Sequence, residues 1–290
     1  MASLVQLYKD MESSLEGMEI PPCPGVLDQI FAESRQEEPD FMRLAALISE
    51  DMALAASLIK TVNSPYFGLQ RRATSVQEAL MLLGLELAAR MVAGILLRHS
   101  FPRRADLDAL WDASIKVAVM SQWLAVRLGR GLGVRPADAY TFGLFRDCGM
   151  AILQLRHKDY PAVTPHARAE AVEPFTAAEQ AALGLNHAVV GAKLASEWRL
   201  SETLAWAILM HHAIAGPLDE LDDAQGLRLI AVAQLADKLL QDNGQLATDH
   251  EWDKLGARCL EILNLDAPAY EGLAEAAGLF IVGELPRLLP

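Results

Sequence analysis

Apolar residues recur at helical spacing along almost the whole chain, and no segment alternates apolar with polar residues over several strands. The period is clearest in three stretches: Leu44, Leu47 and Ile48; Leu54, Leu58, Ile59 and Val62; and Leu80, Leu83 and Leu87. Side chains three or four positions apart lie on one face of an α-helix, whereas a half-buried strand alternates with a period of two. The sequence therefore predicts an all-α fold of roughly a dozen short helices, without a sheet of three or more strands.

Possible helix starts punctuate this pattern. A Ser or Thr followed three residues later by Glu fits the capping-box spacing, in which the hydroxyl caps the helix and the carboxylate reaches back to the cap. The pairs with this spacing are Ser75 with Glu78, Thr176 with Glu179, and Thr248 with Glu251. Asp51 is predicted to cap a helix that runs to about Val62.

The organisation of the chain follows from its breaks. Residues 1–18 are expected to form an N-terminal helix ahead of a proline-rich break, and residues 19–243 to form the main domain. Within that domain we expect an N-terminal lobe at 19–104 and a second lobe at 105–243. Residues 244–290 are expected to add a helical extension. The joints are too short for flexible linkers, so the parts are expected to pack as one body.

Composition excludes two classes of partner. The net charge of −13 argues against a protein that binds nucleic acid, because phosphate binding relies on an excess of Lys and Arg. The longest apolar stretch, residues 79–97, is interrupted by Glu86 and Arg90, so a membrane-spanning helix is not expected. The three cysteines are far apart and form no paired motif, as is typical of free thiols in a reducing cytoplasm.

The N-terminal half carries an unusual string of turn residues. After the proline-rich segment 21–24 come, in order, Asn63, Ser64, Pro65, Gly68 and Gly84. Asn63 and Ser64 can close the preceding helix by side-chain hydrogen bonds, and Pro65 stops it. Gly68 permits a turn with positive φ, and Gly84 is expected to let two helices approach closely. We therefore interpret this string as a structural joint.

These residues, in this order, resemble the HDOD family, a branch of the HD phosphohydrolase superfamily. The resemblance extends from about Glu19 to Gln241. It implies an HD-domain-like multi-helix bundle with an N-terminal helical lobe. It also implies a bacterial signal-transduction output or adaptor module that acts through contacts with a signalling partner and not by turnover.

The resemblance also points to the positions where catalytic relatives bind metal. The corresponding positions here are Ala113, Arg146, Asp147 and Asp237, so the two histidines of the catalytic set are replaced by Ala113 and Arg146. Two carboxylates alone make a weak transition-metal site. We therefore expect a protein that carries no stoichiometric transition metal, no cofactor and no catalytic residue.

Arg146 leaves two alternatives open. Its guanidinium can lie in the vacated metal position and pair with Asp147 or Asp237, replacing the charge of the ion. Alternatively, Arg146 points to solvent and the two aspartates serve as helix caps.

Three histidines match positions that some relatives use for a second metal or for phosphate: His187, His211 and His212. Adjacent residues of a helix point about 100° apart, so only one of His211 and His212 is expected to face the cleft. A histidine at a helix end is also a favourable partner of the helix dipole. Two alternative functions follow: a metal-dependent phosphohydrolase using His187, His212, Asp147 and Asp237, and a sensor that binds a nucleotide without hydrolysing it.

Overall fold

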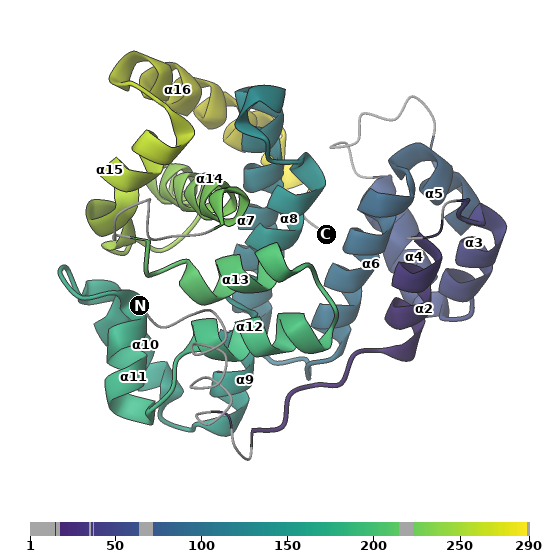
Figure 1. The fold of residues 1–290 in the computed structure, drawn as a ribbon, viewed down its shortest axis with the longest axis horizontal. Coiled ribbons are helices and arrows are strands. Elements are labelled where there is room, and N and C mark those ends of the chain that lie inside the picture. Colours follow the sequence, from purple (N-terminus) through teal and green to yellow (C-terminus); the bar gives the residue numbers. More distant parts are fainter. Residues whose placement is uncertain are drawn as a thin grey trace.

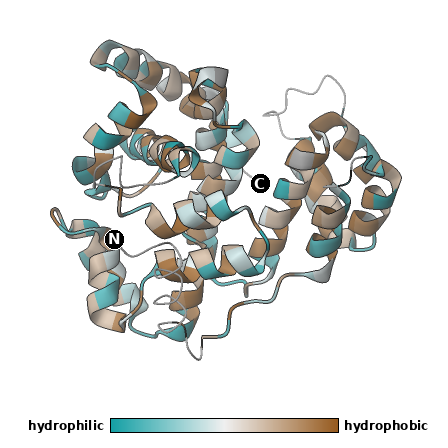
Figure 2. Cartoon of the chain, in the orientation of Figure 1, coloured by the Kyte–Doolittle hydropathy of each residue, from teal (hydrophilic) through white to brown (hydrophobic). Residues whose placement is uncertain are grey.

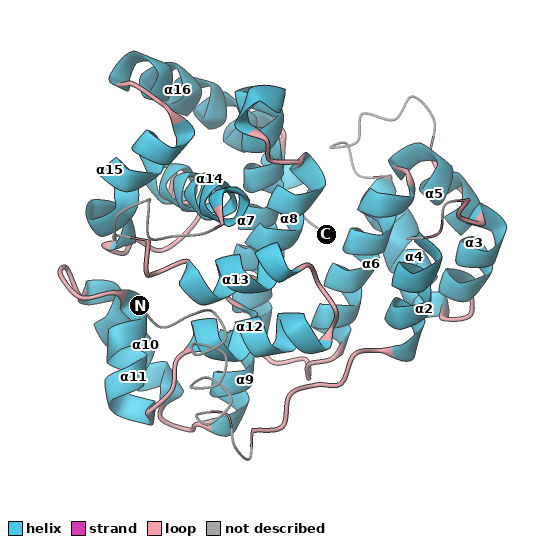
Figure 3. Cartoon of the chain, in the orientation of Figure 1, coloured by secondary structure: helices cyan, strands magenta, loops and turns pink. Residues whose placement is uncertain are grey.

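A computed structural model describes residues 15, 18–34, 36, 38–63, 72–214 and 223–288. The described residues form α-helices and one short 3₁₀ turn, joined by loops, and include no strand (Figure 3). The helices of both lobes carry hydrophobic as well as hydrophilic residues (Figure 2), as expected for amphipathic helices that pack on a shared core. The all-α fold that the sequence predicts is therefore confirmed.

Among the described residues, five helices form the N-terminal lobe, which lies at the right of Figure 1. They are α2 (Gly25–Ser34), α3 (Phe41–Ser49), α4 (Met52–Val62), α5 (Val76–Leu83) and α6 (Leu85–His99). Leu27, Ile30, Ile48, Leu54 and Leu58 are buried completely or nearly so, and they give this lobe its own part of the core. The longest of the five, α6, also packs against the second lobe.

The second lobe is built around a pair of long helices. Its elements are α7 (Ala105–Leu128), a 3₁₀ turn (Arg130–Leu132), α8 (Pro136–Phe145), α9 (Cys148–Arg156), α10 (Tyr160–Ala169), α11 (Phe175–Leu183), α12 (His187–Glu197), α13 (Glu202–Met210) and α14 (Ala224–Asp242). Helix α7 packs along α8 and α14, and α12 packs on α9 and α13. The chain continues with α15 (Glu251–Leu263), α16 (Ala267–Gly283) and α17 (Leu285–Leu288), of which α15 lies against α14.

A buried ion pair joins the two lobes. Asp138 on α8 is 3% exposed, and its carboxylate pairs with Arg90 on α6 and with Arg135 at the start of α8. A charge removed from water in this way requires partners on several sides. The lobes therefore meet through a specific polar contact as well as through apolar packing.

The helix starts that the sequence predicts are confirmed at two positions. The Asp51 carboxylate caps α4 by accepting from the backbone N–H groups of Ala53 and Leu54. The Ser75 hydroxyl accepts from the Glu78 backbone N–H at 3.1 Å. The Glu78 carboxylate reaches one residue further back than a capping box requires, to Thr74.

The predictions of the other two capping boxes, at Thr176 and Thr248, are wrong. Helix α11 begins at Phe175 after Pro174, so Thr176 lies inside it. Helix α15 begins at Glu251, whose backbone N–H is accepted by Asp249 and not by Thr248. The physical reason is that the carboxylates of Glu179 and Glu251 are buried and hydrogen-bonded to histidines, as described below.

Asn63 acts differently from the cap that the sequence suggests. Its backbone N–H closes α4 on the Ile59 carbonyl, while its side chain pairs with Ala73. The side-chain amide donates to the Ala73 carbonyl and accepts from the Ala73 N–H, both at 2.7 Å. The joint therefore holds the segment before α5 against the end of α4. Ser64, Pro65 and Gly68 lie outside the described residues.

Gly84 lies between α5 and α6, with φ +75°. A Cβ at this position would meet nothing within 4 Å, so the predicted close approach of two helices is wrong. The glycine is required because the chain turns through a left-handed conformation that side chains disfavour. The apolar stretch 79–97 is thus split into two helices, and no helix among the described residues is long and apolar enough to span a membrane. Most of the predicted helix 1–18 is outside the described residues.

Candidate metal centre

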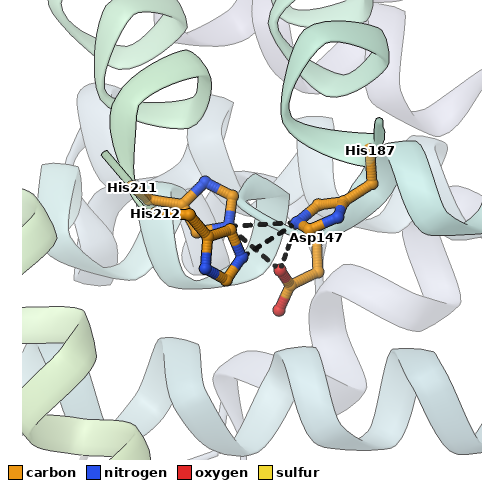
Figure 4. A group of neighbouring side chains, drawn as sticks. All are labelled: Asp147, His187, His211 and His212. Atoms are coloured by element: carbon orange, nitrogen blue, oxygen red, sulfur yellow. Dashed lines mark hydrogen bonds and ion pairs between the residues drawn. The ribbon is translucent and has the colours of Figure 1, made fainter. Parts of the chain in front are cut away.

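Four side chains that are potential metal ligands converge where several helices begin or end in the second lobe (Figure 4). Asp147 lies between α8 and α9, His187 is the first residue of α12, and His211 and His212 directly follow α13. One ligand atom from each residue lies within 4.8 Å of the others. All three histidines are buried.

Close packing of α9 on α12 sets the distance between Asp147 and His187. Gly149 is two residues after Asp147, and a Cβ placed on it would lie 2.0 Å from the His187 carbonyl oxygen. A Cβ on Gly149 would also lie 2.7 Å from the backbone nitrogen of Gly191. Only a residue without a side chain allows the two backbones to approach this closely, so Gly149 fixes the geometry of the cluster.

Both His211 and His212 face the cluster, so the prediction that only one of them could do so is wrong. The prediction assumed a continuing helix, but α13 ends at Met210 and both histidines lie in the turn that follows. The 100° rotation between neighbours applies only inside a helix. Beyond its end, the two rings lie with centroids 4.1 Å apart.

An acceptor lies behind each of the three imidazole rings. The Nδ1 atoms of His187 and His212 lie 2.7 and 2.5 Å from the carboxylates of Glu179 and Glu251. The Nδ1 of His211 lies 2.7 Å from the backbone carbonyl of Ile208. A carbonyl or an ionised carboxylate can only accept, so we assign the ring hydrogen to Nδ1 in all three histidines. The lone pair of each neutral ring is then on Nε2.

The three Nε2 atoms point toward one another and toward Asp147. The Nε2 of His187 lies 3.2 Å from that of His211 and 3.2 Å from that of His212. The Asp147 Oδ1 lies 3.6 Å from the His187 Nε2 and 3.4 Å from the His211 Nε2. A cation bound between these atoms would neutralise the carboxylate and use all three lone pairs.

The donor set fits a divalent transition ion. Bonds of about 2.0–2.1 Å in a tetrahedral site separate neighbouring ligand atoms by about 3.3–3.4 Å. The four distances given above, 3.2, 3.2, 3.4 and 3.6 Å, are close to this value. Metal-bound histidines also donate their second ring N–H to a carboxylate or a carbonyl, as all three rings do here. Asp147, His187, His211 and His212 are therefore the residues that would hold such an ion.

The ionisation of the cluster follows from burial and charge. Burial lowers the pKa of His212 to about 3, with a further contribution from neighbouring His211, and lowers that of His211. Burial acts in the same direction on His187, but Glu179 and Asp147 outweigh it and raise its pKa. Burial would raise the pKa of Asp147, yet Arg146 and the histidines hold it well below its usual range.

Arg146 lies beside the cluster. Its Nε donates to the Asp147 Oδ2 at 3.0 Å, and its Nη2 donates to Asp237 on α14. The guanidinium is buried, and the two carboxylates raise its pKa despite the opposing effect of burial. Of the two alternatives from the sequence, the ion pair is therefore found, and the solvent-exposed arrangement is not. Asp147 faces the guanidinium with one oxygen and the histidines with the other.

A cavity of about 440 Å³ opens onto this group. Ala113 lines it together with Arg146, Asp147 and Asp237, so the four positions of the degenerate site lie around one space. His211 and His212 line it as well, and other charged residues in its wall are Asp112, Lys116, Arg168, Asp249 and Glu251. The structure thus brings together all the candidate site residues from the sequence except the N-terminal joint.

Sequence reasoning missed the residues behind the histidines. Glu179 accepts from His187 and also from the Tyr160 hydroxyl at 2.5 Å, and it is fully buried. Glu251 comes from 39 residues beyond His212. The capping-box spacing explained both glutamates locally. For Glu179 the available signal was its position as a lone carboxylate in an apolar helix, which a buried partner explains better. Glu251 lies between Asp249 and Asp253, and its surroundings in the sequence gave no such signal.

The fold and the cluster define an all-helical protein of the HD-like class, in which helix ends in one lobe carry histidines and aspartate around a cavity. The family model of the HDOD domain matches residues 20–214. The chain therefore belongs to the HDOD domain family. The match ends at Ile214, short of Gln241, where the sequence resemblance was expected to end.

Individual relatives agree with this assignment. A curated, uncharacterised protein from Treponema pallidum (strain Nichols) is 28% identical over 198 residues, which are 67% of this chain but only 38% of that protein. An HDOD domain protein of unknown function from Geobacter sulfurreducens has a similar structure, with a TM-score of 0.75 and 22% identity, covering 97% of this chain and 98% of that one. A Marinobacter aquaeolei VT8 structure named "Putative signal transduction protein" has a TM-score of 0.73 and 18% identity, covering 97% of this chain and 65% of that one. The two structures support the fold.

Proposed function

We propose that this chain is a non-catalytic signal-transduction module whose second lobe is held together by one divalent transition metal ion. Its output passes through contacts with a partner protein. The observation that carries the proposal is the position of Arg146 between Asp147 and Asp237. A permanent cation at that point leaves no room for an ion between the two aspartates.

The neighbouring donor set supports a structural ion. Structural metal sites are commonly filled by four protein ligands, whereas catalytic sites keep one position for water or substrate. Three imidazoles and one carboxylate provide four protein donors here. Because these donors come from the ends of α8, α12 and α13, an ion bound to them would hold three helices in register.

The first test is metal content. Protein purified without a chelator should contain about one equivalent of zinc or a similar ion per chain, because one set of converging donors lies among the described residues. His187→Ala should lose this ion, while His99→Ala, an exposed histidine on α6, should retain it. Metal content is measured by elemental analysis. If wild-type protein contains no metal and does not bind added Zn²⁺, the metal-binding part of the proposal is wrong.

The second test is turnover. A panel of generic phosphoesters and nucleotides should not be hydrolysed by the metal-loaded protein. Hydrolysis that is abolished in His187→Ala and retained in His99→Ala would overturn the non-catalytic assignment. Affinity capture with the full chain as bait, compared with the metal-free His187→Ala variant, then tests whether the output partner requires an ordered second lobe.

One observation favours a second candidate function. The cavity reaches His211, His212 and Asp147, and its wall includes Lys116 and Arg168, which are cations suited to a phosphate group. A phosphohydrolase or a nucleotide sensor would use this space. A rise in Tm with a particular nucleotide, without its hydrolysis, would favour the sensor, and hydrolysis would favour the enzyme.

A further inference from the structure

Glu251 reaches the cluster from outside the part of the chain that the HDOD model matches. It is the first residue of α15 and is 5% exposed. One carboxylate oxygen faces the His212 Nδ1. The other accepts from the Phe175 backbone N–H at 3.1 Å and from Lys254 at 2.7 Å. The carboxylate therefore has a partner on each side and is fixed in one orientation.

The segment that leads to Glu251 is also attached to the second lobe. Lys116 on α7 donates to the Gln245 carbonyl at 3.0 Å, and the Gln241 side chain accepts from the Asp249 N–H at 3.3 Å. Lys254 donates to the Glu173 carbonyl at 2.7 Å. Gln245, Leu246, Ala247 and Asp249 form part of the cavity wall. The turn before α15 and the first residue of α15 therefore line one side of the cavity, and the rest of α15 continues from there.

The chemistry of His212 depends on this attachment. A neutral imidazole can place its hydrogen on either nitrogen, and the tautomer is decided by the partner of the ring. The Glu251 carboxylate keeps the hydrogen on Nδ1 and so leaves the Nε2 lone pair toward His187. Without that acceptor the ring can rotate or change its tautomer, and the cluster loses one aligned donor.

We propose that Glu251 is a positioning residue of the metal centre, and that ion binding and the docking of residues 244–263 stabilise each other. This inference rests on the proposed metal-binding function. Binding energies that are linked in this way are reciprocal, so a change in one must appear in the other by the same factor. The extension beyond the HDOD match is then a part of the metal centre. Binding of an ion to the centre would stabilise the docked position of α15.

The test compares three variants of the full chain in titrations with Co²⁺, whose visible spectrum reports ligand geometry. Glu251→Ala should weaken Co²⁺ affinity about 10–100-fold, as loss of the partner of a metal-bound histidine does elsewhere. Glu251→Gln can still accept the hydrogen bond but lacks the charge, so its loss should be smaller. Glu261→Gln, an exposed glutamate on the same helix, is the matched control and should bind as wild type. A change in the Co²⁺ spectrum of the two Glu251 variants, absent in the control, would separate positioning from general loss of stability.

Hydrogen exchange gives a second readout, which is first made on the wild type. Adding Zn²⁺ to chelator-treated protein should slow amide exchange in α15, and Glu251→Gln should reduce this protection. If wild type binds neither Zn²⁺ nor Co²⁺, the proposed metal site fails. If wild type binds them, but the Glu251 variants bind equally well and α15 exchange is unchanged by the ion, the inference about Glu251 fails alone.

Discussion

At the scale of single residues, Arg146 connects two groups of side chains that the sequence presents separately. It pairs with Asp147 and with Asp237, 91 residues later. It thereby leaves one oxygen of Asp147 for the histidines. A single guanidinium thus links the degenerate positions to the histidine cluster.

Arg146→Ala is expected to destabilise the protein by about 3–5 kcal/mol, because it removes the buried cation that neutralises two largely buried carboxylates. Urea denaturation monitored by circular dichroism measures the loss. Arg156→Ala is the control, since Arg156 pairs with the exposed Glu19 and such pairs contribute about 1 kcal/mol or less. Equal losses for the two variants would show that the Arg146 pair contributes nothing specific.

Asn63 is the second residue whose role the structure defines. Asn63→Ala removes the partner of both the N–H and the carbonyl of Ala73, which is buried. An unpaired buried polar group costs about 1–3 kcal/mol, so we expect a loss of at least about 1 kcal/mol in the free energy of unfolding. Asn63→Asp keeps the acceptor and loses the donor, and its unfolding free energy should fall between those of Asn63→Ala and wild type. If the Asn63→Ala protein is as stable as wild type, the hydrogen bonds between Asn63 and Ala73 do not stabilise the fold, and the structural role proposed for Asn63 is wrong.

At the scale of the elements, the site depends on how closely α9 approaches α12. Gly149→Ala places a methyl group against the His187 backbone, which must then move. Overpacking of this kind costs about 1–3 kcal/mol, and the displaced His187 should also weaken Zn²⁺ binding. Both effects are measured on one sample by thermal unfolding with and without Zn²⁺.

Gly272→Ala on α16 provides the contrast. A Cβ there meets nothing within 4 Å, and alanine stabilises a helix interior by about 0.5–1 kcal/mol relative to glycine. We therefore expect a neutral or stabilising effect and unchanged Zn²⁺ binding. If Gly149→Ala behaves in the same way as Gly272→Ala, the close approach of α9 and α12 is not what positions His187.

At the scale of the whole molecule, metal affinity should depend on pH through one histidine. The Nδ1 of His187 already carries a hydrogen, so its proton of ionisation occupies Nε2, the atom that would bind the ion. Its pKa is raised by Glu179 and Asp147 despite burial, whereas the pKa values of His211 and His212 are lowered. Because the pKa of His187 is raised, the proton on its Nε2 begins to compete with the metal ion at a higher pH than it would on an ordinary histidine.

The apparent Zn²⁺ association constant should therefore be constant above the pKa of His187. Below it, the constant should fall about tenfold per pH unit, one proton being displaced per ion. Competition titrations with a chelating dye measure this slope. They are run between about pH 5 and 8, the range in which histidines usually titrate. A slope near three would show that all three histidines are protonated together, and a flat profile would show that His187 does not bind the ion.

The sequence by itself determined the all-α class and the cap at Asp51, because helical period and capping are local and depend on residues a few positions apart. The alternatives for Arg146 came from the family resemblance. It also identified His187, His211 and His212 as candidates, by resemblance. Only the tertiary structure decided that both His211 and His212 face the cluster, because that depends on α13 ending at Met210. Glu179 and Glu251 were wrongly predicted to belong to capping boxes, because the prediction used only the spacing of nearby residues. Their buried partners lie 8 and 39 residues away, and local spacing carries no information about contacts made across the fold.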